Sequence, residues 1–168
     1  MNVNDTITRN LQPLASQPGK QHLLTVLKAI GDRMSSQPLR TAGLVIKAGG
    51  GVLAKIGSAD YYASVNGVLV KIAASTDMPA LTGLTITAAY FNVACFFVDS
   101  AGTVTVAFGT EGSTLALVKW PPFPENKALV GCLIITHSST FTGNTTALDT
   151  ATTVYISPVG AFDPTILI

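Results

Sequence analysis

The dipeptide Asn66-Gly67 constrains the fold most, because it stands between two short apolar runs, residues 60–65 and 68–73. Asn-Gly is the preferred pair for a two-residue type I′ turn, which joins antiparallel strands. Pairing across this turn separates the side chains into an apolar face and a mixed face, as a half-buried hairpin requires. The apolar pairs are Val65–Val68, Ala63–Val70 and Tyr61–Ile72, and the mixed pairs are Ser64–Leu69 and Tyr62–Lys71.

A second hairpin is predicted from residues 90–98 and 103–108, joined through the turn at 99–102. One face of its first strand carries Phe91, Val93, Cys95 and Phe97. Apolar runs between turn signals predict further strands. These runs are residues 44–47, 52–56, 115–120, 129–136 and 153–157.

Two segments near residue 125 have opposite roles. Leu129–Ile135 is apolar at nearly every position, which predicts a central strand covered on both faces. Pro121–Pro124 cannot join a sheet ladder and is expected to form a rigid crossing loop. The fold class that follows is mainly β, an antiparallel β-sandwich or barrel, with a jelly-roll-like arrangement among its forms.

The residues before the strands follow a helical period. Leu23, Leu27, Ile30 and Met34 are spaced by four, three and four, and predict a helix over about 19–35. Leu24 and Val26 widen this apolar stripe, and Pro38 prevents the helix from continuing. Two interpretations stay open: the stripe packs on the chain's own sheet, or it seals against a symmetry-related copy. It spans fewer than three heptads, too few to establish a coiled coil.

The change of period divides the chain into two parts. Residues 1–40 are expected to form an N-terminal arm and one helix for docking and oligomerisation, and residues 41–168 an antiparallel β domain. The first part is mildly basic, which suits either an ordinary solvated helix and leader or an arm that binds an acidic protein surface.

The composition favours a protein whose surface is covered by partners. Charged residues make up 11% of the chain, against about 25% in a typical domain. The net charge of +1 provides no strong field toward nucleic acid or anionic lipid. Residues 78–98 and 128–148 lack charge, but polar residues interrupt both, so we expect no membrane span. The first residues show neither region of a signal peptide.

Cys95 and Cys132 both lie within apolar runs. A disulfide between them is geometrically possible if their strands are neighbours. Buried free thiols are the favoured interpretation, consistent with folding in a reducing cytoplasm.

The sequence shows no convincing catalytic or metal-binding constellation. A triad of His137, Ser138 and Asp149 has no nucleophile elbow, and adjacent strand residues point to opposite faces. The glycine run 49–51 lacks the ending of a phosphate-binding loop and is better interpreted as a bend between strands. A pair of carboxylates of the glycosidase kind stays open. We therefore expect no enzyme activity, no cofactor and no metal.

Residues 119–151 carry a resemblance to a known class. A Pro-rich loop is followed by an Ala-x-x-Gly apolar strand from Ala128 and by a Phe-x-x-x-Thr-Thr-x-Leu-Asp turn from Phe141. The hairpin at 96–104 is similar in style. This pattern resembles small virion structural proteins of tailed bacteriophages, over roughly the C-terminal half of the chain.

The resemblance implies a capsid decoration (cement) protein that binds and stabilises the head. Such proteins are small, β-rich and often trimeric. The implied partners are other copies of the chain, with a trimer expected, and the major capsid protein or another virion protein, without nucleic acid or membrane. The implied location is the virion, assembled in the host cytoplasm. The candidate contact residues are Leu23, Leu27, Ile30, Met34, Arg9 and Lys20.

Two alternatives stay open beside this expectation. A fibre component or a receptor- or glycan-binding component of the virion would need an exposed aromatic platform. The candidates for such a platform are Tyr61, Tyr62, Tyr90 and Trp120. A small hydrolase is the third class, and no constellation supports it.

Overall fold

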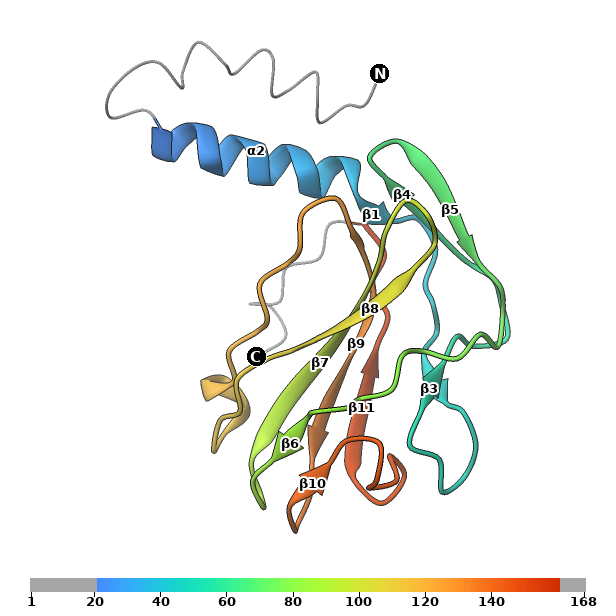
Figure 1. Cartoon of the computed structure of the whole chain (residues 1–168), viewed down its shortest axis with the longest axis vertical. Coiled ribbons are helices and arrows are strands. Elements are labelled where there is room, and N and C mark those ends of the chain that lie inside the picture. The colour runs from blue at the N-terminus through green and yellow to red at the C-terminus, as the bar shows by residue number, and fades with distance from the viewer. Residues whose placement is uncertain (1–20, 161–168) are drawn as a thin grey trace.

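The computed structural model describes residues 21–160 of the 168-residue chain. One helix, α2 (Gln21–Ser35), precedes a series of antiparallel strands (Figure 1). The predicted fold class is confirmed: the protein is mainly β and sandwich-like, with an N-terminal region and one helix before the sheets. The strands are β1 (Gln37–Pro38), β2 (Val45–Ile46), β3 (Ala54–Lys55), β4 (Tyr61–Val65), β5 (Val68–Ile72), β6 (Thr85–Ile86), β7 (Phe91–Val98), β8 (Val104–Phe108), β9 (Ala128–Thr136), β10 (Phe141–Thr142) and β11 (Thr152–Ile156).

The central sheet has the order β11-β9-β7-β8. Strand β9 lies between β11 and β7, and eight of its nine residues are buried, which confirms the central strand predicted there. The register of β7 against β9 shifts between Phe96 and Phe97. This irregularity is the bulge that one unpaired residue produces in an antiparallel pair.

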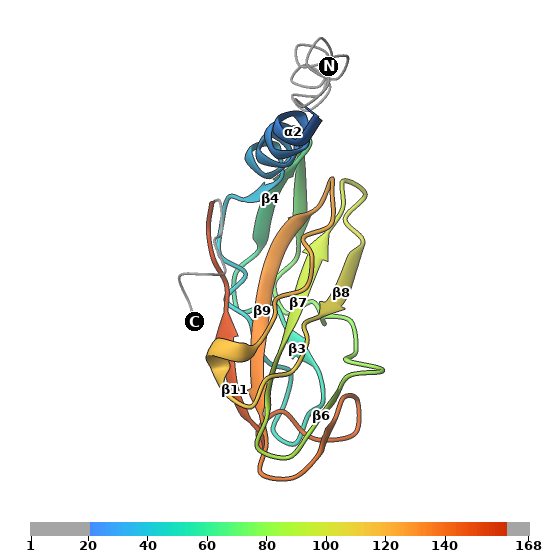
Figure 2. The same ribbon diagram turned by 90° about the vertical axis from the view of Figure 1, so that its left-hand side faces the viewer.

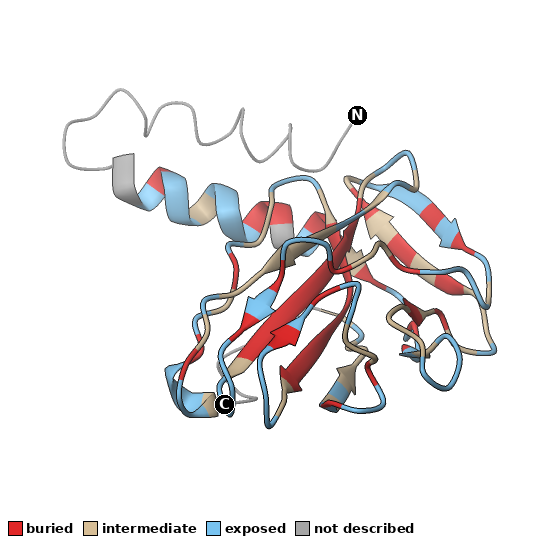
Figure 3. Ribbon diagram, turned by 60° about the horizontal axis from the view of Figure 1, so that its bottom comes forward, coloured by how far each residue is buried: buried red, intermediate tan, exposed pale blue. Residues whose placement is uncertain are grey.

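Each face of the central sheet contributes to its own core. On one face, Ala94, Phe96 and Val98 pack with residues of three smaller sheets, β1-β4-β5, β2-β3 and β10-β6. The hydroxyl of Tyr61 on β4 donates a hydrogen bond of 2.9 Å to the carbonyl of Leu129 and so joins two layers. The central strands are red, and therefore buried, in Figure 3.

On the other face, Val93, Cys95 and Phe97 pack under the segment between β8 and β9. Phe123 from this segment meets Phe97 edge to face, with ring centroids 5.3 Å apart. The crossing loop predicted at residues 121–124 therefore covers the second face of the sheet, a role that the sequence did not indicate.

The Asn66-Gly67 hairpin is confirmed residue by residue. Tyr61 pairs with Ile72, Ala63 with Val70 and Val65 with Val68. The φ angles of Asn66 and Gly67 are +53° and +78°, as a type I′ turn requires. The second predicted hairpin is also formed: β7 pairs antiparallel with β8, and Val98 lies opposite Val104.

The strand predicted at residues 115–120 is wrong. Leu115–Leu117 forms a 3-10 turn (η1) instead, and only Lys119 makes an isolated bridge, to Thr110. The run is apolar because Leu115 and Val118 pack into the second core from a turn, and not because they belong to a strand. Strands β6 and β10, which pair with each other, and β1 were not predicted.

Helix α2 is fastened to the β domain at its C-terminal end. The backbone N–H of Asn126 donates to both carboxylate oxygens of Asp32, at 3.0 and 3.2 Å. The backbone N–H of Asn66 donates to the hydroxyl of Ser36, at 3.3 Å. Strand β1 follows at once and pairs with β4. Figure 2 shows the helix at one end of the molecule, beyond the sheets.

Within residues 21–160, no helix is both long enough and apolar enough to span a bilayer. The two uncharged stretches contain strands β6 and β7 and strands β9 and β10, respectively.

Candidate functional site

The apolar stripe of α2 faces solvent. The exposed fractions are 48% for Leu23, 48% for Ile30 and 66% for Met34, and Leu27 is half-buried. Val26 extends this surface and is 40% exposed. The sequence left open whether the stripe packs on the chain's own sheet or against a symmetry-related copy. The exposed side chains of the stripe do not pack on the chain's own sheet. We call the set Leu23, Val26, Leu27, Ile30 and Met34 the helix stripe.

The helix contacts its own domain through different residues. Leu24 is 8% exposed, although the sequence placed it at the margin of the stripe. Asp32 and Ser35, further along, are also buried. The side of the helix that meets the β domain is therefore next to the stripe and separate from it. In Figure 3 much of the helix is exposed, with the buried positions concentrated toward its C-terminal end.

The remaining two predicted contact residues, Arg9 and Lys20, lie outside the described residues. The structure therefore places four of the six predicted residues on one helix surface.

Sequence reasoning did not single out two exposed leucines in the elements that follow α2. Leu69 on β5 is 66% exposed, and Leu39, which follows β1, is 50% exposed. Strand β5 begins at the turn whose Asn66 contacts Ser36. The pattern did place Leu69 on the mixed face with Ser64, but it gave no sign that this hairpin tip adjoins the helix.

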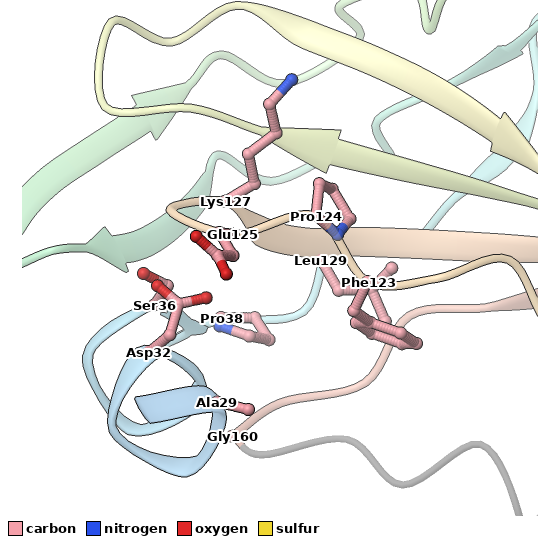
Figure 4. A pocket seen from close by; sticks show the side chains of 10 residues that line it. All are labelled: Ala29, Asp32, Ser36, Pro38, Phe123, Pro124, Glu125, Lys127, Leu129 and Gly160. Atoms are coloured by element: carbon pink, nitrogen blue, oxygen red, sulfur yellow. The ribbon is translucent and has the colours of Figure 1, made fainter. Parts of the chain in front are cut away.

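A cavity of about 180 Å³ lies between α2, β1 and the loop that precedes β9 (Figure 4). Asp32 and Glu125 both line it, so this is where a carboxylate pair could be sought. The carboxylate of Asp32 is already engaged by the backbone of Asn126. Lys127 extends away from the two acids in Figure 4. The arrangement holds the helix to the loop and gives no support to glycoside hydrolysis.

The triad considered from the sequence is not assembled. His137 Nδ1 lies 2.9 Å from the hydroxyl of Ser139, the residue after Ser138. Asp149 instead accepts the backbone N–H of Gly50 at 2.6 Å. That contact fixes the glycine run as the turn between β2 and β3, which agrees with the bend expected there.

No group of three or more His, Cys, Asp or Glu side chains able to hold a metal occurs within the described part of the chain. The acidic groups with lowered pKa values serve local structure. Hydrogen bonds from the backbone and hydroxyl of Thr87 lower the pKa of Glu111. A hydrogen bond from Lys71 lowers the pKa of Asp60 across the β4–β5 hairpin.

The four aromatic residues considered for a binding platform do not gather on one surface. Tyr61 is fully buried in the first core, and burial raises the pKa of its hydroxyl. Trp120 packs against the second core, on the opposite face of the central sheet. Tyr62 and Tyr90 are left partly exposed.

Comparison of the chain with models of protein families, with curated proteins and with solved structures found no match.

Proposed function

We propose that this chain is a non-enzymatic structural protein of a bacteriophage virion, a capsid decoration (cement) protein that binds the head and stabilises it. The helix stripe is the observation that carries the proposal. A chain that keeps a helix of large apolar side chains open to water needs something to cover that surface. The phage context rests on the resemblance of residues 119–151 to small virion proteins.

The stripe is suited to other copies of the same helix. Spacings of four, three and four are those of the apolar positions in helices that pack side by side. Every member of the stripe is uncharged, so like helices can approach along it without charge repulsion. We therefore assign the stripe to self-association, with a trimer as the expected form.

The energetics are adequate for a weak or moderate oligomer. Covering a half-exposed large apolar side chain contributes about 1 kcal/mol. Covering the five stripe residues of all three copies contributes about 15 kcal/mol. Forming a trimer takes two association steps, each of which costs roughly 4–15 kcal/mol. Repeated contacts around a capsid symmetry site then add avidity that one copy lacks.

Self-association is tested by light scattering coupled to size exclusion. The full chain should elute as a trimer, and the variant with Leu23→Ser, Ile30→Ser and Met34→Ser should elute as a monomer with an unchanged β-type circular dichroism spectrum. The matched control is Leu117→Ser with Val159→Ser, because both side chains are exposed, at 60% and 57%, and both lie off the helix. A wild-type monomer at micromolar concentration contradicts the assignment.

Attachment is tested separately, on empty heads built from the major capsid protein of the same virion. We expect the trimer to co-sediment with the heads and to raise their resistance to heat. Deletion of residues 1–20 should abolish attachment and leave the β domain folded. Attachment that survives this deletion moves the docking surface elsewhere. Binding to host cells without binding to heads favours the fibre or receptor-binding alternative and contradicts decoration.

A further inference from the structure

Cys95 on β7 and Cys132 on β9 are direct cross-strand partners. Their sulfur atoms lie 3.0 Å apart, and both are free thiols with 0% exposure. Directly opposed residues in an antiparallel pair have Cα atoms roughly 4.5–5.5 Å apart. Disulfides span Cα separations of about 4.4–6.8 Å, so the backbone is already placed for a bond.

We propose that Cys95 and Cys132 form an oxidation site, which closes into an intramolecular disulfide between the two central strands when the chain folds in the presence of a low-molecular-weight disulfide. The inference goes beyond the proposed function and does not depend on it. It also differs from the free-thiol interpretation favoured by the sequence, which applies where thiols are kept reduced.

The reaction balances as two thiol–disulfide exchanges. One cysteine thiolate attacks glutathione disulfide, forms a mixed disulfide and releases one glutathione thiolate. The second cysteine thiolate attacks the protein sulfur of that mixed disulfide, forms the Cys95–Cys132 bond and releases the second glutathione. The two protein thiols are oxidised, one glutathione disulfide is reduced, and two protons pass from the protein to the two glutathione thiolates.

Burial determines when this exchange takes place. Burial raises the pKa of the Cys95 thiol, and the neighbouring Cys132 raises it further. The thiolate is the reactive form, so the raised pKa protects the Cys95 thiol from exchange. Both sulfur-bearing side chains are also fully buried, which keeps a soluble disulfide away from them. The second core also covers them, through Val118 and Phe123. The oxidation state of the two cysteines is therefore determined during folding, before the second core buries β7 and β9. It then persists in the folded protein.

The bond has a structural consequence because its two ends are far apart in the chain. The two cysteines are 37 positions apart in the sequence. A bond between them would close a loop that includes β8 and the segment covering the second core. Closing such a loop restricts the unfolded chain. For a domain of this size, we expect the midpoint of thermal unfolding to rise by roughly 5–15 °C.

The test refolds the full chain from denaturant in two buffers, one with glutathione disulfide and one with dithiothreitol. We expect the first product to have lost two hydrogen atoms by intact mass, to show no titratable thiol and to unfold at the higher temperature. Cys95→Ser and Cys132→Ser serve as controls. Each should keep its one remaining thiol in dithiothreitol, and in glutathione disulfide it should either keep that thiol or carry one glutathione on it. The comparison of wild-type protein refolded in the two buffers decides the question by itself, so poor folding of a variant does not affect the result.

A second measurement uses the folded, reduced protein. Its thiols should react with glutathione disulfide at least about tenfold more slowly than those of the urea-unfolded chain, because exchange needs the thiolate and access to it. Wild-type protein that refolds in the oxidising buffer and keeps two titratable thiols overturns the proposal. Cross-linked dimers in place of the internal bond overturn it as well.

Discussion

The carboxylate of Asp32 accepts the backbone N–H of Asn126 with both of its oxygens. An acidic residue in the last turn of a helix is unfavourable for the helix dipole, so its position there needs another reason. The contact supplies one, because it joins α2 to the loop before β9 across 94 positions of sequence. Asn126 takes a φ of +58° to present its N–H.

Replacing Asp32 by Asn should lower the free energy of unfolding by roughly 1–3 kcal/mol, because a charge-assisted pair of hydrogen bonds to a buried group is weakened. Urea unfolding followed by circular dichroism measures the change. Asp77→Asn is the matched control, since Asp77 pairs with Lys47 at the surface and such pairs contribute about 0–1 kcal/mol. Equal losses in the two variants would show that the Asp32 contact is not special.

Gly131→Ala should lower the free energy of unfolding by about 1–3 kcal/mol through overpacking. A Cβ at this position would lie 2.6 Å from Leu44 Cδ1 and 2.5 Å from the carbonyl of Ile156. Both neighbours belong to packed parts of the domain. Gly49→Ala is the control, because the nearest atom to its Cβ is 4.0 Å away. Chemical denaturation of both variants side by side decides the point, and a neutral Gly131→Ala contradicts it.

Gly67→Ala should also lower the free energy of unfolding, by about 1–2 kcal/mol, but for a conformational reason. No atom lies within 4 Å of a Cβ built there, and the φ of +78° alone opposes the side chain. Gly67→Asn should therefore recover part of the loss, because Asn tolerates the left-handed region. Thermal unfolding of the two variants gives the comparison. Equal losses of unfolding free energy in Gly67→Ala and Gly67→Asn would show that side-chain contacts, and not the backbone conformation, cause the destabilisation.

Stability should fall in acid partly through Glu111. Its pKa is lowered from 4.5 by the backbone and hydroxyl hydrogen bonds of Thr87, so the folded state binds fewer protons than the unfolded state. The stabilising contribution is therefore present above pH 4.5 and is lost as the pH falls through the lower, folded value. The melting temperature of the wild type should drop more between pH 7 and about pH 3 than that of Glu111→Gln. Parallel curves for the two proteins would contradict this.

The hairpins and the central strand could be predicted because their signals are local. Asn66-Gly67 specifies a turn, the turn sets the register, and the register sorts the faces. Strand β9 is recognisable because burial on both faces removes alternation. Strands β6 and β10 gave no such signal, because each has two residues and gains its structure from the other, which is 55 or more positions away.

The candidate site was partly predictable. Periodicity located the helix stripe, but it could not decide whether Leu23 or Leu24 meets the β domain, since both fit an apolar face. That choice depends on the anchoring of Asp32 and Ser36 by residues far along the chain. The hairpin tip with Leu69 joins the same end of the molecule for the same reason. Contacts of this kind leave no pattern in a single sequence.

The strand order β11-β9-β7-β8 affects how the protein is made. Strand β9 gains its second neighbour only after Thr152–Ile156 has left the ribosome, whereas α2 emerges more than a hundred residues earlier. If the helix stripe mediates the proposed self-association, we expect helices of chains growing on the same messenger to meet while their β domains are still incomplete. Pairing of copies would then begin during translation and precede the closing of the sheet.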